Sequence, residues 1–448
     1  MTKTLTEIKK YDTFIYDKFE IEDADHSLKI KFYYEIVGLK KFIHKLEIPY
    51  RNTSINKDFV NKLVFNIGLL ELVSYWKACI PYNLEINCGA ITDKQKEFFK
   101  KIYFHGLGEF FYQNKIKPDY DTFININSYG PLYDSSVEYN EEGNLICIGG
   151  GKDSCVSLSL LPTKNTSCFI INPKPVMLEC ASIAGYKENE ILCVKRTIDK
   201  SLLELNNEGF LNGHTPFSAM VAFVSYLAAY LNNKKNIILS NESSANESNV
   251  AGTKINHQYS KSYEFELDFQ NYAKEFLGGD INYFSLLRPL TEYQIGMLFA
   301  KKEPFHKVFK SCNVGSKENP WRWCCNCAKC LFVYCLLAPH LYKDKLVSIF
   351  GEDLFANPAL LQTFKELLGK ENVKPFDCVG TFEEINYAIT KTIKNLNTND
   401  LPILLSYYKE NYYDEDLLKL DLEHSYNKNH SLSKENEQLI KEAINYER

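Results

Sequence analysis

Residues 145–154 constrain this chain more than any other stretch, and they read Leu-Ile-Cys-Ile-Gly-Gly-Gly-Lys-Asp-Ser. An apolar, β-branched run stops at three glycines, and a helix-like segment, residues 155–161, follows. This order predicts a strand, a tight turn and the start of a helix. Glycines let backbone N–H groups approach an anion closely, and a helix N-terminus adds partial positive charge. The stretch therefore predicts a phosphate-binding loop.

Each residue of the loop has an expected part in holding a nucleotide. The candidate nucleotide-binding residues here are Gly149, Gly150, Gly151, Lys152, Asp153 and Ser154. The glycines would cradle phosphate, Lys152 would neutralise its charge, Asp153 would hold Mg²⁺, and Ser154 would donate its hydroxyl. The spacing fits neither a Walker A loop nor a dinucleotide fingerprint. The plain alternative is a glycine-rich turn before an ordinary helix.

The loop resembles the pyrophosphate-binding (PP) loop of ATP pyrophosphatases, usually Ser-Gly-Gly-x-Asp-Ser. The usual first Ser is Gly149 here, which removes one hydroxyl. Those enzymes split ATP into AMP and pyrophosphate, usually to adenylate a substrate. The resemblance implies ATP and Mg²⁺ as cofactors.

Composition sets the protein class. The chain has 448 residues, of which 45% are hydrophobic and 24% charged, and its net charge is −5. These values are typical of a globular protein, and they do not indicate a general nucleic-acid-binding surface. We find no signal peptide and no apolar run of membrane-spanning length. The 14 cysteines are not spaced like a disulfide framework, so we expect a reducing, cytoplasmic location.

The middle of the chain alternates between strand and helix patterns. Expected strands are residues 145–148, 167–171, 191–194 and 236–239, and a long helix is expected over residues 215–231. Such alternation predicts an α/β fold with a parallel sheet wrapped by helices, whose ligands bind at the carboxyl ends of the strands. Asn172 and Asn241 follow two of these strands, so both are candidate nucleotide-binding residues, although a polar segment after a strand can be only a loop.

The regions before and after this alternating segment predict other kinds of structure. Residues 1–140 predict an α+β unit on the substrate side, with an antiparallel pair of strands over residues 28–37 and 40–48. Residues 141–340 would form the ATP pyrophosphatase domain, and residues 341–448 a helical C-terminal region. Glu264 and Glu266 would share one face of a possible strand, where solvated carboxylates are expected.

A cysteine cluster predicts a metal site. Two overlapping Cys-x-x-Cys pairs lie in residues 324–330, and another cysteine precedes them. We choose Cys312, Cys324, Cys327 and Cys330 as ligands of a structural Zn²⁺, which four thiolates bind tetrahedrally. Cys325 is then spare, or substitutes if Cys324 points away. An iron–sulfur cluster and unrelated buried cysteines are the alternatives.

Several further stretches carry a resemblance to one family. They are residues 71–77 (ELVSYWK), 106–112 (GLGEFFY), 239–246 (LSNESSAN), 256–262 (NHQYSKS), 283–290 (YFSLLRPL) and 374–381 (KPFDCVGT). With the loop and the cysteines, they resemble the UDP-N-acetyl-alpha-D-muramoyl-L-alanyl-L-glutamate epimerases over about residues 20–390. The loop and cysteines alone are shared with 7-cyano-7-deazaguanine synthases.

This resemblance implies an ATP-dependent isomerase of peptidoglycan precursor synthesis. It would invert the terminal L-glutamate of UDP-MurNAc-L-Ala-L-Glu through an acyl-adenylate. We expect His257, Glu242 and Lys261 to be catalytic, although each has a plainer alternative, namely a polar loop contact, a turn cap and a solvated charge. Another adenylating or tRNA-modifying enzyme, and a non-catalytic ATP-binding protein, are the competing functions.

Overall fold

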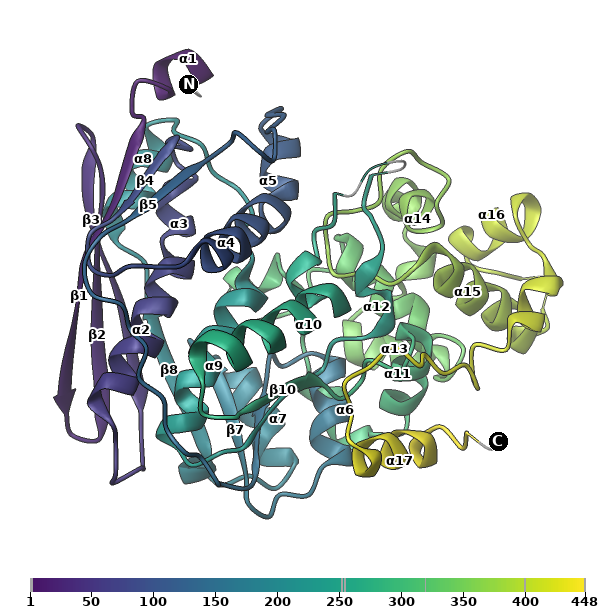
Figure 1. Ribbon diagram of the computed structural model, residues 1–448. Helices are drawn as coiled ribbons and strands as arrows, with labels where there is room; N and C mark the ends of the chain where they lie inside the picture. The colour runs from purple at the N-terminus through teal and green to yellow at the C-terminus, as the bar shows by residue number, and fades with distance from the viewer. Residues whose placement is uncertain (1–2, 251–252, 254, 319, 399, 447–448) are drawn as a thin grey trace.

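A ten-stranded sheet organises the computed structural model, which describes residues 3–250, 253, 255–318, 320–398 and 400–446. The strand order is β10-β9-β6-β7-β8-β3-β2-β1-β4-β5 (Figure 1). The strands are β1 Thr13–Ala24, β2 Ser27–Ile36, β3 Lys40–Pro49, β4 Asn83–Ile86, β5 Asn125–Ser128, β6 Asn144–Cys147, β7 Thr166–Ile171, β8 Ile191–Thr197, β9 Asn236–Leu239 and β10 Asn282–Ser285. The helices are α1 Leu5–Ile8, α2 Lys57–Glu71, α3 Val73–Trp76, α4 Asp93–Gly106, α5 Gly108–Gln113, α6 Lys152–Leu160, α7 Pro175–Ile183, α8 Lys200–Asn207, α9 Phe217–Leu231, α10 Tyr263–Tyr272, α11 Glu292–Ala300, α12 Ala328–Leu337, α13 Lys343–Phe350, α14 Leu361–Leu367, α15 Phe382–Leu396, α16 Ile403–Asn411 and α17 Lys434–Ala443.

Most neighbouring strands of this sheet pair in parallel, including β1 with β4 and β4 with β5, and five of the strands form the parallel run that the alternating pattern predicts. Strands β10, β9, β6, β7 and β8 pair in parallel in that order. The predicted strands and the long helix are confirmed, the helix being α9. Helices wrap this part of the sheet, which confirms the α/β class in its broad form.

The parallel strands are buried on both faces, and alternate residues serve two separate cores. Leu145, Phe169 and Ile237 face a core shared with α9, α10 and the N-terminal elements. Their neighbours Ile146 and Ile238 face a second core with α6, α7, α11, α12 and the C-terminal helices. This follows from the two-residue period of a strand. The central residues of these strands therefore form short apolar runs rather than an alternating pattern.

The N-terminal strands extend the same sheet. β1, β2 and β3 are antiparallel, with Leu28 opposite Ile48, which confirms the predicted pair. β3 then pairs with β8, also antiparallel, and so joins the N-terminal region to the parallel strands. The division at about residue 140 stays a prediction, because one sheet runs through both regions.

The strand expected around Glu264 and Glu266 is wrong, since these residues lie in α10. Ser262 caps this helix by accepting a hydrogen bond from the Phe265 backbone N–H. Phe265 and Phe269, four residues apart, are both buried. The apolar residues therefore follow the helical period rather than the strand period.

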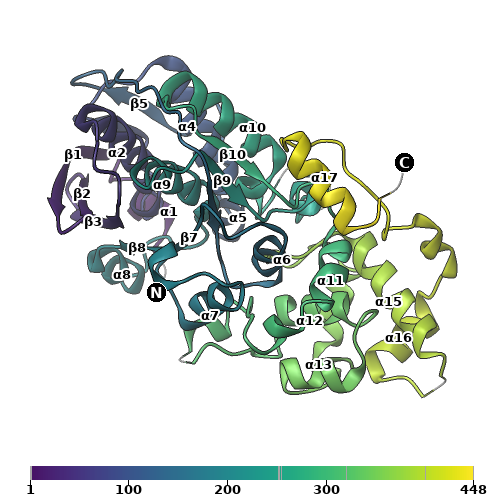
Figure 2. The same ribbon diagram turned by 90° about the horizontal axis from the view of Figure 1, so that it is seen from below.

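The C-terminal region is helical, as expected, and lies on the other side of the parallel strands from β1–β3 (Figure 2). Its helices belong to the second core, together with α11 and α12. Among the described residues, no helix has both the length and the apolar character needed to cross a membrane.

A buried ion pair ties the N-terminal helices to the parallel half of the sheet. The Arg196 guanidinium on β8 donates to both Glu71 carboxylate oxygens, with Nη2 2.6 Å from Oε2. The Glu71 side chain is 1% exposed. Burial alone would raise the pKa of Glu71, but Arg196 and His44 outweigh it and hold the pKa well below its usual range. Both partners therefore stay charged inside the protein.

We predict that Glu71→Ala lowers the free energy of unfolding by about 3–5 kcal/mol, because it leaves the Arg196 charge buried and unpaired. Glu20→Ala, which removes an exposed partner of Lys18, should leave that free energy nearly unchanged. Denaturant unfolding measures both. Equal effects of the two substitutions would contradict the assigned role of the buried pair.

Candidate functional site

The glycine loop adopts the expected strand–turn–helix form. It connects β6 to α6, with Gly151 as the N-cap. Gly150 has a φ of +80°, a conformation that favours glycine, and its carbonyl accepts a hydrogen bond from the Lys310 backbone N–H at 2.9 Å. A Cβ at Gly149 would meet no atom within 4 Å, so the Ser usual at this position would fit.

A cavity of about 320 Å³ opens at this loop. It lies at the carboxyl ends of β6, β7 and β9, where ligands bind in open α/β sheets. Its polar and charged lining includes Asp153, Ser154, Ser218, Ser240, Asn241, Lys261, Ser311, Asn313, Lys329 and Cys378, with Trp321, Phe169 and Met177 among the apolar residues. The cavity combines backbone N–H groups, two ammonium groups and a carboxylate.

The loop side chains divide between this cavity and the interior. Asp153 and Ser154 line the cavity with Gly149 and Gly151. Burial alone would raise the pKa of Asp153, but Lys152 and Lys329 outweigh it and lower the pKa, so the group is a carboxylate. Lys152 instead lies beneath the loop, 1% exposed, in ion pairs with Asp153 and Glu292. Its ammonium group therefore pairs with these two carboxylates in the protein interior.

The two predicted asparagines also differ. Asn241 lines the cavity, and its carbonyl accepts a hydrogen bond from Ser285 Oγ at 2.7 Å. The Asn172 side chain turns to β8, where it donates to the Arg196 carbonyl at 2.9 Å and accepts from the Arg196 N–H at 2.8 Å. Asn172 therefore links β7 to β8, and its neighbour Ile171 lines the cavity.

A buried arginine holds together the segments that carry Glu242 and Lys261. Arg288 donates to the carbonyl of Glu242 at 2.6 Å and to that of Lys261 at 2.7 Å. It also pairs with Glu266, with 3.0 Å between Nη2 and Oε2. Glu242 is itself buried, and its charge raises the pKa of Lys261. Arg288 is thus the structural support of both predicted residues.

Lys261 contacts a cysteine that no local sequence pattern marks. Its Nζ donates to Cys378 Sγ at 3.0 Å. Burial alone would lower the pKa of Lys261, but Cys378, Glu242 and Asp153 raise it above its usual value. Burial alone would likewise raise the pKa of the Cys378 thiol, but Lys261, His257 and Lys329 together bring it down to about 6. Cys378 is therefore a thiolate at neutral pH.

His257 lies next to this thiolate in a cluster with Glu109 and His214. Its Nδ1 contacts Glu109 Oε2, and Cys378 lies close enough to the ring to raise its pKa. Burial alone would lower the pKa of His257, but Cys378 and Glu109 raise it to about 9. The His214 ring centre is 4.4 Å away, and burial followed by the charge on His257 lowers the pKa of His214 to about 3. The two imidazoles are thus in opposite protonation states.

The structure brings the four predicted cysteine ligands together. All four Sγ atoms lie within 4.8 Å of one another. Three of their separations are 3.8 Å (Cys312 to Cys327), 3.8 Å (Cys324 to Cys330) and 3.5 Å (Cys327 to Cys330). Metal–sulfur bonds of about 2.3 Å in a tetrahedron place the sulfurs about 3.8 Å apart. Cys325 instead points to the Phe350 carbonyl at 3.1 Å. The cluster therefore fits a tetrahedral metal ion.

The cysteine cluster supports one wall of the cavity. Trp321 and Lys329, which line the cavity, are in the loop and helix that carry the ligands. The Trp321 indole donates to the Cys312 carbonyl at 2.9 Å. Lys329 lies between two ligands and donates to the Cys378 carbonyl. A metal at this cluster would thus hold cavity residues in place without touching a substrate.

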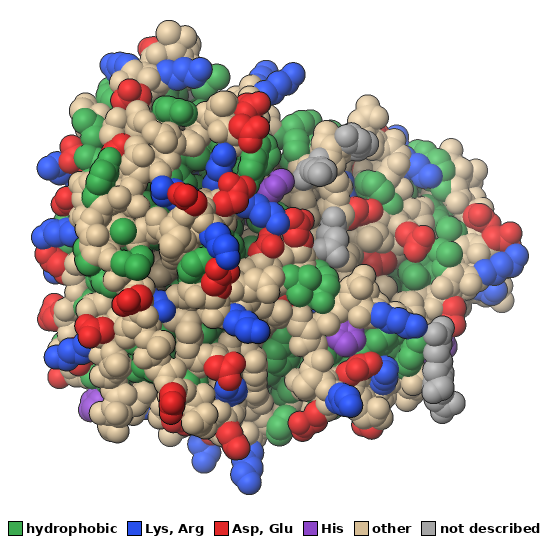
Figure 3. All heavy atoms as spheres, viewed as in Figure 1, with side chains coloured by type: hydrophobic (Ala, Val, Ile, Leu, Met, Phe, Trp, Pro, Cys, Tyr) green, Lys and Arg blue, Asp and Glu red, His purple; other side chains and the backbone are tan. Residues whose placement is uncertain are grey.

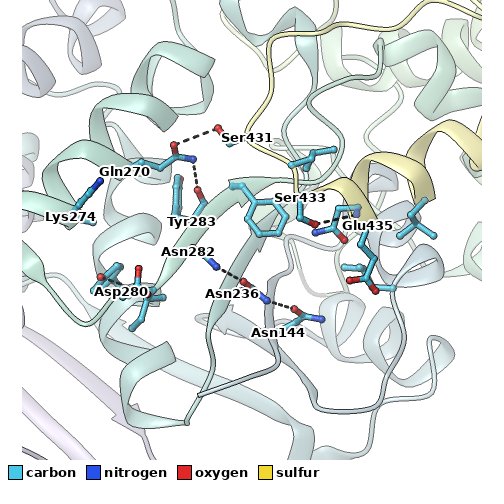
Figure 4. A pocket seen from close by; sticks show the side chains of 18 of the residues that line it. Asn144, Asn236, Gln270, Lys274, Asp280, Asn282, Tyr283, Ser431, Ser433 and Glu435 are labelled. Carbon is cyan, nitrogen blue, oxygen red and sulfur yellow. Dashed lines mark hydrogen bonds between the residues drawn. The ribbon is translucent and has the colours of Figure 1, made fainter. Parts of the chain in front are cut away.

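A larger cavity, about 1180 Å³, lies at the other end of the strands, beside α17 (Figure 4). There Asn282 donates to Asn236 at 2.8 Å, and Asn236 donates to Asn144 at 3.0 Å, across three neighbouring strands. These side-chain amides hydrogen-bond to one another across the sheet. Ligands of such sheets usually bind at the carboxyl ends of the parallel strands, whereas this cavity lies at their amino ends. The smaller cavity therefore remains the candidate site.

On the face shown in Figure 3, acidic and basic side chains are interspersed.

Comparisons with known proteins show the family of this chain. The family model of the MurL N-terminal domain matches residues 5–286, and that of the MurL C-terminal domain matches residues 308–417. This chain belongs to the MurL family. It is therefore an enzyme of the isomerase class, because the curated relatives that it matches over most of their length are named as epimerases.

Three curated relatives bear the name UDP-N-acetyl-alpha-D-muramoyl-L-alanyl-L-glutamate epimerase. The protein of Xanthomonas oryzae pv. oryzae is 33% identical over 353 residues, 76% of either chain. The Micromonospora protein is 31% identical over 410 residues, 89% of this chain and 90% of its own. The Salinispora tropica protein is 32% identical over 380 residues, 82% of this chain and 81% of its own. No solved structure is significantly similar to the chain.

Sequence reasoning within this MurL chain missed Cys378, Lys329 and the pairing of Glu109 with two histidines. Cys378 and Glu109 do lie in stretches that carry the family resemblance, which is the signal that could have marked them. Neither stretch has a residue spacing that indicates a catalytic site, because the residues that Cys378 and Glu109 contact lie far away in the chain.

Metal content tests the cysteine cluster. We expect the purified protein to hold one tetrahedral metal ion per chain and Cys327→Ser to lose it, because three thiolates leave the site incomplete. Cys325→Ser is the matched control, since Cys325 is adjacent but points away. Elemental analysis by mass spectrometry measures both, and an unchanged metal content in Cys327→Ser would refute the ligand set.

Alkylation tests the state of Cys378. The rate of its reaction with iodoacetamide should rise as the pH passes about 6, because only the thiolate reacts. Lys261→Met should move this inflection to higher pH by removing the charge that stabilises the thiolate. Peptide mass spectrometry follows the label, and an inflection above pH 8 in the unaltered protein would contradict the assigned ionisation.

Proposed function

We propose that this chain epimerises the terminal L-glutamate of UDP-MurNAc-L-Ala-L-Glu to D-glutamate, with conversion of ATP to AMP and pyrophosphate. The names of its three relatives support the substrate and the epimerisation. The observation that supports ATP use is the cavity that joins the glycine loop to Lys261, Lys329 and Asp153.

We infer that residues 149–154 form a pyrophosphate-binding loop. Backbone N–H groups at the start of α6 point toward the end of the sheet at which the cavity opens, and they favour anions. Lys261 and Lys329 add two positive charges for the phosphates, and the Asp153 carboxylate is suited to Mg²⁺. Lys152 would act indirectly, by setting the charge of Asp153 from below the loop.

Adenylation explains how the glutamate α-proton becomes removable. A free α-carboxylate makes the neighbouring C–H a very weak acid, since the carbanion would lie beside a full negative charge. Attack of this carboxylate on the α-phosphorus of ATP removes that charge and leaves a carbonyl that accepts an enolate. Each unit by which the α-proton pKa falls takes about 1.4 kcal/mol off the cost of removing it.

The charged groups near the cavity suit the proton-transfer steps. The His257 imidazolium is a proton donor, and the Lys261 ammonium stabilises the enolate oxygen. Glu242, buried beside Lys261, keeps the two roles expected from the sequence, a Mg²⁺ ligand or a base. The Arg288 guanidinium donates to the backbone carbonyls of both Glu242 and Lys261, which supports a fixed spacing between these two residues.

We further propose that the cysteine cluster binds a structural Zn²⁺, because four thiolates leave no open coordination position. Thiolates persist in a reducing compartment, which fits the expected cytoplasmic location.

The reaction itself is directly testable. The protein should convert the L-glutamate-terminated nucleotide to the D-epimer only with ATP and Mg²⁺, and it should release AMP and pyrophosphate. Chiral analysis of the hydrolysed product measures this. Recovery of L-glutamate alone, or release of ADP, would refute the proposal.

Asp153→Asn should lower kcat by about 100-fold or more, because it removes the carboxylate expected to hold Mg²⁺. Asp344→Asn, on an exposed turn of α13, is the matched control and should keep full activity. Steady-state AMP release compares the two variants.

A further inference from the structure

Cys378, His257 and Glu109 form a continuous line of contacts that ends at the cavity. His257 contacts Glu109 through Nδ1 and lies close enough to the Cys378 thiol for the two groups to shift each other's pKa. Cys378 lines the cavity with Asp153 and Ser154 of the glycine loop. A nucleophile within hydrogen-bond reach of a histidine, which a third group orients, is the arrangement that activates cysteine for acyl transfer.

The segment that carries Cys378 is fixed from several sides. The Asn249 side chain donates to the Pro375 carbonyl at 2.9 Å and accepts from the His257 N–H at 2.8 Å. One amide thus sets the spacing between the cysteine segment and the histidine segment. The neighbouring Asp377 accepts from Asn313 at 2.8 Å, in the cysteine-cluster loop. The thiol is therefore held in position before substrate binds.

Two lysines complete the surroundings of the thiol. Lys261 donates to the sulfur itself, and Lys329 donates to the backbone carbonyl of the same residue. Both ammonium groups line the cavity. They lie where negative charge would develop on an acyl oxygen during attack by sulfur, and fixed charges of this kind stabilise such a transition state.

We propose that Cys378 is a catalytic nucleophile that takes the glutamyl group from AMP as a thioester. This inference rests on the proposed acyl-adenylate. The Cys378 sulfur attacks the acyl carbon, the bond from that carbon to the phosphate oxygen breaks, and AMP leaves with the electron pair. Glu242, the candidate base, then takes the α-proton from one face of the glutamyl α-carbon, next to an uncharged thioester carbonyl, and the His257 imidazolium returns a proton to the other face. Water finally cleaves the carbon–sulfur bond, which releases the carboxylate and restores the thiolate.

Transfer to sulfur has a physical advantage. It frees the phosphate part of the cavity before the proton is moved, while the α-carbon keeps an activated, uncharged carbonyl. Glu109 is a positioning residue in this scheme, because it contacts His257 rather than the cavity. Glu109→Gln should shift the basic limb of the pH–rate profile downward, since Glu109 favours the charged imidazole.

A double-labelling experiment tests the thioester. The full chain is mixed with ATP, Mg²⁺ and UDP-MurNAc-L-Ala-L-Glu, quenched in acid, and its free thiols are blocked with iodoacetamide. Neutral hydroxylamine then cleaves any thioester, and a second label marks the thiol that it exposes. We expect the second label on Cys378 only, and only when both ATP and the nucleotide are present.

Cys378→Ala separates this inference from the proposed function. The variant should keep substrate-dependent exchange of pyrophosphate into ATP within tenfold, because adenylation needs no thiol, while D-glutamate formation falls at least 1000-fold. Cys193→Ala, which removes a half-buried thiol on β8, is the control and should keep both activities.

The outcomes are distinct. If the unaltered protein shows neither pyrophosphate exchange nor epimerisation, the proposed function fails. If the unaltered protein epimerises but Cys378→Ala does so within tenfold of it, or if no second label appears on Cys378 during turnover, the thioester inference is overturned and the proposed function stands.

Discussion

Parallel pairing of β6 with both β7 and β9 is the constraint on which the rest of the site depends. It brings the carboxyl ends of three strands to one edge, so the glycine loop and the loop after β9 face the same cavity. Hydrophobic burial on both faces of these strands keeps the pairing in place. Antiparallel pairing would send the two loops to opposite edges and leave no common cavity.

Buried charged side chains then fix the positions of the loops that the sheet brings together. Arg288 joins the Glu242 and Lys261 segments, and the Lys152–Glu292 pair supports the glycine loop from below. A buried charge is tolerated only with a partner and full hydrogen bonding, so each pair allows few alternative arrangements. The cavity can therefore hold a thiolate and two ammonium groups at defined positions, with the His257 imidazolium beside the thiolate.

The glycine loop and the cysteine cluster could be predicted because their signals are local. Ten consecutive residues carry the strand, the turn and the helix start, and the two Cys-x-x-Cys pairs carry three of the four clustered cysteines. The orientation of Lys152 could not be predicted in the same way, because Glu292, 140 residues later, takes its ammonium. Asn172 followed a strand as expected, yet the neighbouring β8 backbone takes its amide.

The sequence by itself determined the α/β class, the loop, the group of four cysteines and the family, since each depends on neighbouring residues or on matched stretches. Only the tertiary structure decided which side chains face the cavity. Cys378 has an ordinary sequence context, and its low pKa comes from Lys261, His257 and Lys329, which other segments bring to it. Electrostatic interactions act through space and over a few ångströms, so they depend on folded distances that no local pattern encodes.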